Sequence, residues 1–411
     1  MFIFRKKACI RLMGCIWWIT CSSIQIFHQK GLKFIMKRSA QTSRVAVALS
    51  GGVDSSVAAA LLIEQGFDVF GITMRLPQSE ELQAKADLAE PAYIHDAQQA
   101  AEILGIRHVV IDIRKEFQEQ IVTYFCEEYA RGRTPNPCVV CNPNIKFGRL
   151  FELARELGAD IFATGHYVNV EYDPHRQRYV LKTADNLAKD QSYFLYRLSQ
   201  TQLAHTLFPL AAFTKDRIRQ KAKELGLHRV AEKADSQENC FIADQSYQDF
   251  LQDYLPEHAR QPGPIVDMAG HILGEHQGIH RYTIGQRRGL GVALGSPRYV
   301  VAIHPETNTV VIGKNQELFT QAFLVEDVHF VSLEALSWPL ECLVKVRYRH
   351  AATPATIYPE AGKTIRVMLH TPQRAVTPGQ SAVFYAQDRV IGGGTIVQTA
   401  MPSDSADQNA C

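Results

Sequence analysis

Three cysteines stand in polar stretches of this 411-residue chain and are its strongest candidates for covalent chemistry. Cys138 and Cys141 form a Cys-x-x-Cys pair, and because Gly132 and two prolines precede it, we predict a loop here. The pair suits half of a zinc site, a redox couple, two iron–sulfur ligands or two packed thiols. No second Cys-x-x-Cys exists, which excludes a four-cysteine zinc site. Cys240, in the second polar stretch, suits either a buried or a reactive thiol.

An anion-binding turn is the second chemical feature. Residues 45–49 form an apolar run of strand length, and the sequence Ser-Gly-Gly follows at 50–52. The glycines let the backbone bend sharply, and Asp54 and Ser55 are favourable at the start of a helix. Free N–H groups at that start, with the positive end of the helix dipole, attract phosphate. The pattern is neither the Gly-Lys-Ser/Thr of a Walker loop nor G-x-G-x-x-G.

A framework of alternating strands and helices must position these residues between residue 44 and about 164. Strands are predicted at 45–49, 68–74, 108–111 and 160–164, and helices at 97–104, 117–129 and 147–157. This alternation predicts a parallel sheet with helices on both faces. Ligands bind at the carboxyl ends of such strands, so we expect the glycine turn and the Gly165–His166 pair, each directly after a strand, to border one cleft.

The rest of the chain has a different texture. A hairpin is predicted at 168–172 and 178–182, and helices at 215–225 and 247–254. Short alternating segments at 299–303, 309–313, 342–349, 364–370, 381–385 and 390–397 predict a small antiparallel barrel. Arg347, Tyr348 and Arg349 place an aromatic ring between two arginines. That arrangement suits phosphate contacts and base stacking, and it is also ordinary on an exposed strand.

The composition is that of a globular protein of two or three domains, 46% hydrophobic and 21% charged, with a net charge of +2. There is no chain-wide basic field for nucleic acid, although a local basic surface is compatible with this balance. Nine cysteines in this length do not make a disulfide scaffold, so we expect a cytoplasmic, reducing compartment.

The first 43 residues contain no Asp or Glu and include an uncharged, largely apolar stretch at 12–27. This stretch is short for a membrane span, and we predict no membrane partner. A signal or transit peptide is one interpretation. We favour an upstream extension, disordered or preceding a true start at Met36. The polar tail at 401–411 is predicted to be disordered.

Taken together, these stretches resemble the tRNA-specific 2-thiouridylases of the MnmA/TrmU family, within the PP-loop ATP pyrophosphatases. The resemblance covers residues 44–402. Its motifs are, in chain order, the Ser-Gly-Gly-x-Asp-Ser-Ser turn at 50–56, Gly-Arg-Thr-Pro-Asn-Pro at 132–137, Ala-Thr-Gly-His-Tyr at 163–167, Lys-Asp-Gln-Ser-Tyr at 189–193, Asp-Ser at 235–236 before Cys-Phe at 240–241, Thr-Ile-Gly-Gln-Arg at 283–287 and Thr-Pro-Gly-Gln at 377–380. The paired cysteine motifs and the Gly-Gln segment are the most specific of these.

The resemblance implies an α/β plus β architecture. A Rossmann-type PP-loop domain (adenine nucleotide alpha hydrolase-like, 44–245) would precede a small central tRNA-binding domain (246–315) and a C-terminal antiparallel β-barrel (316–400). The implied reaction adenylates the C2 oxygen of uridine 34 in the anticodon stem-loop of tRNA with ATP and Mg²⁺. A persulfide sulfur then displaces AMP and leaves 2-thiouridine. A persulfide donor or relay protein is the second implied partner.

The family also implies roles for particular residues. Cys141 would be the nucleophile, Cys240 would carry the persulfide, and Cys138 would be an accessory thiol where some relatives have Asp. Residues implied to contact ATP are Ala48, Leu49, Ser50, Gly51, Gly52, Val53, Asp54, Ser55, Met74 and Gly165. Residues implied to contact the target base are Asn136, Pro137 and Cys138, and those for tRNA are Lys189, Asp190, Gln191, Arg347 and Tyr348. Arg287, Arg288 and Arg349 extend the expected basic contacts.

Three alternatives stay open at this point. The three cysteines suit a labile iron–sulfur cluster with one open iron site as well as a persulfide route. A different PP-loop ligase, adenylating a small substrate for attack by ammonia, would leave Cys141 and Cys240 unused. A non-catalytic protein that binds tRNA or a metal would keep only the fold.

Overall fold

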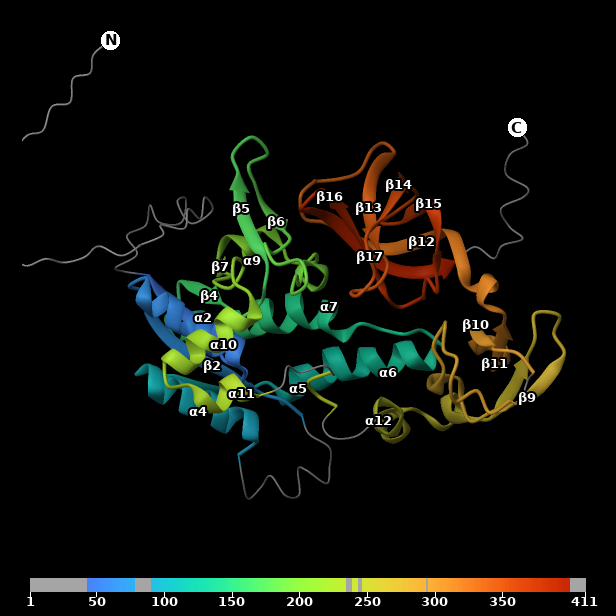
Figure 1. Cartoon of the computed structure of the whole chain (residues 1–411), viewed down its shortest axis with the longest axis horizontal. Coiled ribbons are helices and arrows are strands. Elements are labelled where there is room, and N and C mark those ends of the chain that lie inside the picture. Colours follow the sequence, from blue (N-terminus) through green and yellow to red (C-terminus); the bar gives the residue numbers. More distant parts are fainter. Residues whose placement is uncertain (1–42, 78–89, 234–238, 243–245, 293–294, 400–411) are drawn as a thin grey trace, which may run out of the picture.

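The structure is a computed structural model that describes residues 43–77, 90–233, 239–242, 246–292 and 295–399 (Figure 1). The predictions for the leader before residue 43 and for the tail at 401–411 lie outside these residues. Within the described residues, no helix is both long and apolar enough to cross a membrane.

A five-stranded parallel sheet forms the base of the first part, in the order β3-β2-β1-β4-β7. Its strands are β1 (Arg44–Ala48), β2 (Asp68–Arg75), β3 (His108–Asp112), β4 (Ile161–Ala163) and β7 (Thr206–Leu207). Four of them confirm the predicted strands. The fifth, β7, has two residues, too few for an alternating pattern to reveal it.

Helices cover both faces of this sheet, as predicted. On one face Val45 and Val47 pack against Ala59 and Leu62 of α2, while on the other Ala46 packs in the cluster that includes α8. The helices are α2 (Val53–Glu64), α4 (Ala92–Leu104), α8 (Leu150–Glu156), α9 (Gln200–Ala204), α10 (Lys215–Glu224) and α11 (His228–Glu232). Gly105, in the left-handed region at φ 67°, ends α4.

Two helical stretches pass through π-helical turns. The first runs through α5 (Arg114–Phe117), η2 (Gln118–Val122) and α6 (Thr123–Ala130). The second runs through α7 (Pro137–Cys141) and η3 (Asn142–Arg149) into α8. The predicted loop at the Cys-x-x-Cys pair is therefore wrong from Pro137 onward. Proline is favoured in the first turn of a helix, where its missing N–H costs nothing, so Pro137 begins α7 rather than preventing it.

The second part is a small mixed sheet in the order β10-β11-β8-β9, where β8 and β11 are parallel. Its strands are β8 (Gly263–Val266), β9 (Ile272–His276), β10 (Tyr299–His304) and β11 (Thr309–Gly313), preceded by α12 (Tyr247–Tyr254). The segments predicted at 299–303 and 309–313 thus lie outside the C-terminal barrel.

Short 3-10 turns span Ser192–Phe194, Glu257–Arg260, Ile279–Arg281, Pro305–Thr307 and Asn315–Leu318.

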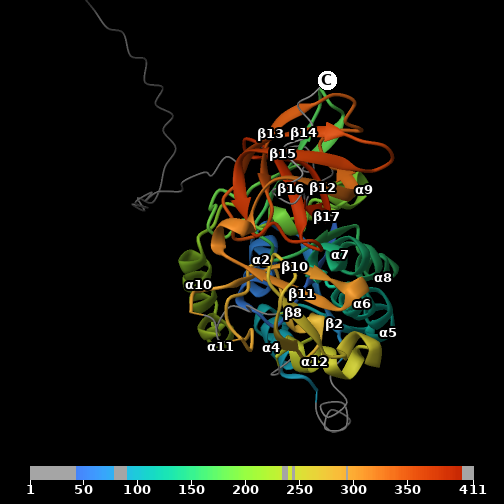
Figure 2. The ribbon, with the colours of Figure 1, turned by 90° about the vertical axis from the view of Figure 1, so that its right-hand side faces the viewer.

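The C-terminal part is a closed antiparallel barrel, as predicted. Its strands follow the order β12-β15-β14-β13-β16-β17, and pairing of β12 with β17 closes it (Figures 1 and 2). They are β12 (Phe319–Phe330), β13 (Leu340–Lys345), β14 (Thr353–Pro359), β15 (Ile365–Arg374), β16 (Ser381–Ala386) and β17 (Arg389–Thr399). The predicted hairpin, β5 (Asn169–Asp173) and β6 (Arg178–Lys182), joins this sheet at β17, where Lys182 pairs with Arg389.

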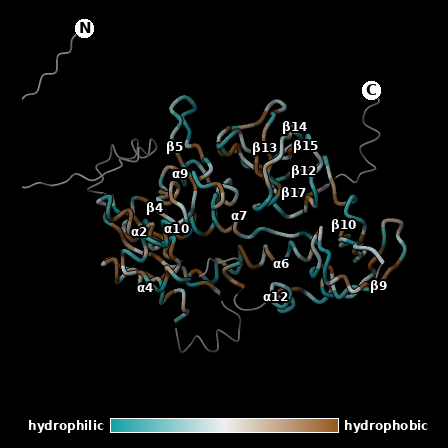
Figure 3. The backbone as a smooth tube through the Cα atoms, in the orientation of Figure 1, coloured by the Kyte–Doolittle hydropathy of each residue, from teal (hydrophilic) through white to brown (hydrophobic). Residues whose placement is uncertain are grey.

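The barrel also holds the segment that leads into α7. The Thr134 N–H donates to Pro378 O at 2.9 Å, and Gln380 Nε2 donates to Thr134 O at 2.7 Å. Gly379 is required between them, because a Cβ there would lie 2.8 Å from Thr134 N. Hydrophobic and hydrophilic segments alternate along the chain in all three parts (Figure 3).

Candidate active site

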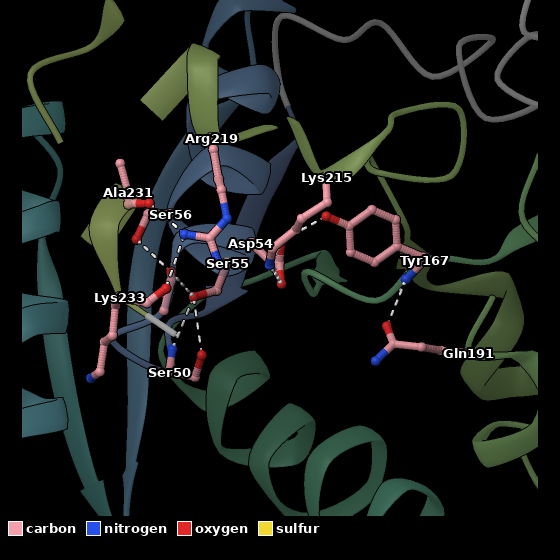
Figure 4. A network of polar contacts seen from close by, with 11 residues as sticks. Ser50, Asp54, Ser55, Ser56, Tyr167, Gln191, Lys215, Arg219, Ala231 and Lys233 are labelled. Atoms are coloured by element: carbon pink, nitrogen blue, oxygen red, sulfur yellow. Dashed lines mark hydrogen bonds and ion pairs between the residues drawn. The ribbon is translucent and has the colours of Figure 1, made fainter. Parts of the chain in front are cut away.

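The glycine turn, residues 50–55, is held in shape by its own hydroxyl groups. The Ser50 N–H donates to Ser55 Oγ at 3.1 Å, and Ser55 Oγ donates to Gly52 O at 3.1 Å (Figure 4). Gly51 has φ 69°, and a Cβ on it would overlap Tyr93 O, so only glycine fits. The conformation of the turn is thus fixed by contacts within the protein.

Asp54 is the charged centre of this turn. Lys215 Nζ, from the start of α10, donates to both carboxylate oxygens of Asp54 at 2.7 and 2.8 Å. The Tyr167 hydroxyl donates to Asp54 Oδ1 at 2.6 Å. The Lys215 side chain is 13% exposed and that of Asp54 is 33% exposed. The sequence analysis missed Lys215, because a lysine in the first turn of a helix has no distinctive pattern.

Gly165 lies directly against the turn, so the two segments that were expected to meet are in contact. A Cβ on Gly165 would come 2.7 Å from Ser55 N and 2.8 Å from the Asp54 carbonyl carbon. The next residue, His166, shares a hydrogen bond of 2.8 Å with Thr164 Oγ1. Burial, with a smaller contribution from Lys146, lowers the pKa of His166 to about 3, so its ring is neutral at physiological pH.

A substitution at Gly165 therefore tests whether a nucleotide binds at this turn. In Gly165→Ala, backbone atoms of the turn must shift to make room for the Cβ. Overpacking of this kind costs about 1–3 kcal/mol. We expect ATP affinity, measured by titration calorimetry, to fall about tenfold or more. Gly295→Ala is the matched control, since a Cβ there meets nothing within 4 Å. Equal ATP affinity in both variants would show that nucleotide does not bind at this turn.

The other residues implied to contact ATP lie at the same edge of the sheet. Ala48 ends β1 and Leu49 follows it, and Met74 stands near the end of the neighbouring β2. Met74 O accepts a hydrogen bond of 3.2 Å from the Tyr93 hydroxyl. Val53 begins α2 and is buried, so of this residue the backbone alone is available to a ligand.

The three cysteines come together although Cys240 is distant in sequence. Cys138 and Cys141 are three residues apart on α7 and share a helix face, and Cys240 lies close enough for its charge to act on the pKa of Cys141. Lys146 interacts electrostatically with all three cysteines. We call Cys138, Cys141 and Cys240 the three-cysteine site.

The environment of these thiols differs from the prediction. Cys141 is 5% exposed and packs in a hydrophobic cluster with Phe117 and Ile121, so it is not in an open polar loop. Burial raises the pKa of Cys141 far above its ordinary value. Cys240 is exposed to solvent, yet desolvation by the surrounding protein raises its pKa to about 11. Both are therefore thiols rather than thiolates at neutral pH.

A metal site is not apparent in this arrangement. In the part of the chain that the structure describes, no three His, Cys, Asp or Glu side chains come together closely enough to hold a metal ion.

The residues implied to contact tRNA meet at the junction with the barrel. The Tyr348 ring lies 4.4 Å from that of Phe194, and Lys189 and Asp190 both act on the pKa of Tyr348. Asp190, however, is 4% exposed and its carboxylate accepts hydrogen bonds from Ala184 and Ser192. The contacts of the Asp190 carboxylate are therefore with groups inside the protein.

Two more of these residues have internal partners. Gln191 Oε1 accepts the Tyr167 N–H at 2.9 Å, and Arg347 donates to Ile284 O at 3.1 Å and to Thr377 Oγ1. Charge reversal at Arg347 would disturb this contact as well as any RNA contact. Arg287 and Arg288 are exposed and are the cleaner probes. Asn136 precedes α7 and is half-buried, and Pro137 is buried.

Three family models match consecutive parts of the chain. The tRNA methyl transferase HUP domain matches residues 43–244, the tRNA methyl transferase PRC-barrel domain 248–314, and the Aminomethyltransferase beta-barrel domain 320–396. The tRNA-specific 2-thiouridylase MnmA of Acetivibrio thermocellus is 46% identical over 356 residues, 86% of this chain and 99% of that protein. The tRNA-specific 2-thiouridylase MnmA 1 of Caldanaerobacter subterraneus subsp. tengcongensis is 47% identical over 357 residues, 86% of this chain and 98% of that protein.

Proposed function

The chain belongs to the tRNA-specific 2-thiouridylase family, and on that premise we propose that it uses ATP and a cysteine persulfide to thiolate C2 of uridine 34 in tRNA. What supports the mechanism is the adjacency of the glycine turn and the three-cysteine site. The carbonyl oxygen of Tyr93 lies against Gly51, and the charge of Cys240 acts on the pKa of the Tyr93 hydroxyl. The charge of Lys146 likewise lowers the pKa of His166, which follows Gly165 in the chain.

In the proposed first half-reaction, the glycine turn binds the triphosphate of ATP. Backbone N–H groups and the hydroxyls of Ser50 and Ser55 face the phosphates, and Lys215 adds a positive charge. Asp54 offers carboxylate oxygens, which suit Mg²⁺ bound jointly by one carboxylate and substrate phosphates. Bound there, Mg²⁺ would offset the charge on the leaving pyrophosphate. The uridine C2 oxygen attacks the α-phosphorus, and esterification makes it a good leaving group.

In the proposed second half-reaction, the terminal sulfur of a Cys240 persulfide attacks C2, and AMP leaves with the oxygen. Cys141 then attacks the Cys240 sulfur, which frees the transferred sulfur on the uridine and leaves a Cys141–Cys240 disulfide. A thiol reductant restores both thiols, and a persulfide donor or relay protein reloads Cys240. A reducing cytoplasm suits this cycle. Cys138 has no required step in it.

For tRNA, we propose that the exposed Arg287 and Arg288 and the half-buried Lys189 contact backbone phosphates. The Asn136 segment before α7 would then border the target base. Asp190 and Arg347, given their internal partners, would act by holding the barrel junction in place.

The function is tested by incubating the purified protein with ATP, an unmodified tRNA that has U34, and a chemical persulfide donor. We expect 2-thiouridine at position 34 by nucleoside mass spectrometry, with one pyrophosphate released per thiolation and none without tRNA. Pyrophosphate release that does not need tRNA, with ammonia consumed, would favour a PP-loop ligase instead. Binding of tRNA with no turnover would favour a non-catalytic protein.

A further inference from the structure

One half-buried cation, Lys146, lies among the three cysteines and has no role in the mechanism above. Burial alone would lower the pKa of Lys146, but Cys141, Cys138 and Cys240 act on it together, and the pKa is raised above its ordinary value. Cys141, Cys138 and Cys240 are, in that order, the groups that raise it. The groups that act on the Lys146 pKa are thus cysteine sulfurs, which are thiols at neutral pH and become charged only as thiolates or persulfides.

The π-helical turns of η3 bring Lys146 to this place. Lys146 is the fifth residue after Cys141, and α7 continues directly into η3. In an α-helix the fifth residue is rotated well away from the first, because one turn takes 3.6 residues. A π-helix closes its hydrogen bonds five residues apart, so the fifth residue returns to the same face. The helix register therefore returns Lys146 toward the face of Cys141.

A side chain from outside the helix stabilises these wide turns. Gln202 Nε2, from α9, donates to Pro143 O at 2.7 Å and to Phe147 O at 3.0 Å. Insertion of such a group among helix carbonyls is a recognised cause of irregular turns. The position of Lys146 is hence built into the fold and does not depend on its own side-chain contacts.

Of the four titratable groups seen to interact with Lys146, three are the cysteines and the fourth is His166. His166 is neutral at physiological pH, so it supplies no competing charge. Lys146 is then a cation that acts both on the three-cysteine site and on His166, the residue next to Gly165, and its charge acts strongly because its burial limits screening by water.

We propose that Lys146 is the charge partner of the sulfur anions in this reaction. It holds the terminal sulfur of the Cys240 persulfide before transfer and favours the Cys141 thiolate that resolves it. No covalent step is added, and Lys146 remains an ammonium throughout. The inference rests on the proposed function, but its main test uses neither ATP nor tRNA.

The test measures the alkylation rate of Cys240 and Cys141 by iodoacetamide between pH 6 and 11, resolved by peptide mass spectrometry. Lys146→Met removes the charge and keeps the length of the side chain, and Lys146→Arg keeps the charge. We expect Lys146→Met to slow alkylation of Cys240 at pH 8 about tenfold and to move its pH profile upward, since the thiolate loses its cation. Lys146→Arg should stay close to the wild type.

Lys115→Met is the matched control, because Lys115 is on α5 with 85% of its side chain exposed. Circular dichroism and thermal melting establish that each variant is folded, and single-turnover thiolation from preloaded persulfide gives a second measurement. Equal alkylation profiles in folded Lys146→Met and wild type would overturn the proposal, even if thiolation were slower. A shifted profile in a protein that thiolates no tRNA would support the charge role and reject the proposed function.

Discussion

Replacing Asp54 by asparagine is expected to reduce tRNA-dependent pyrophosphate release at least 100-fold. The carboxylate stands at the start of α2 and is the group of the glycine turn that suits a divalent cation. Loss of a preorganised charge that acts on the departing phosphates costs about as much as loss of an oxyanion donor, roughly 10²–10³ in rate. The amide keeps the shape of the side chain, so the fold should be retained.

Asp54 also has a structural partner, and the experiment must separate the two roles. In Asp54→Asn, Lys215 loses the ion pair at 2.7 Å but stays beside the turn. We therefore expect ATP to bind within a few-fold of the wild type while pyrophosphate release collapses. Asp216→Asn, at the neighbouring exposed carboxylate on α10, is the control. An Asp54→Asn protein that adenylates tRNA at the normal rate would move the nucleotide site elsewhere.

Cys240→Ser is expected to abolish 2-thiouridine formation, by roughly a thousandfold or more, because a hydroxyl cannot carry a persulfide. Pyrophosphate release should continue in this variant, since adenylation depends on the glycine turn and not on sulfur. Cys141→Ser should permit at most a partial transfer, leaving sulfur bound between Cys240 and uridine. Single-turnover thiolation with mass spectrometry of the protein and the tRNA measures all of these.

Cys138→Ser is the informative comparison, because Cys138 shares the helix face of Cys141 yet has no step in the persulfide route. We expect it to retain most of the activity, in protein purified without oxygen and free of iron. Iron-dependent activity lost equally in all three cysteine variants would contradict the persulfide route and favour a cluster. Full activity in Cys240→Ser would exclude both routes.

The glycine turn of the candidate nucleotide site could be predicted from local sequence because its residues are adjacent in the chain. A buried strand, two glycines and a helix start form the glycine turn within about ten residues, and the physical requirement for glycine at Gly51 is local backbone conformation. The alternation of strand and helix likewise gave the parallel sheet, and the short alternating segments after residue 316 gave the barrel. The family resemblance named roles for the cysteines that residue patterns alone left open.

The tertiary structure decided which groups surround those residues. The sequence provides no signal that Lys215 meets Asp54, that Gln202 bonds the π-helical turn that carries Lys146, or that Asp190 is buried, because each depends on contacts between distant elements. The same holds for Cys141, which reads as part of a polar loop but packs beside Phe117 once α5 and α7 are docked. Local residue types determine a turn or a helix, whereas burial and charge pairing arise only when the elements pack, and these set the pKa values on which the sulfur chemistry depends.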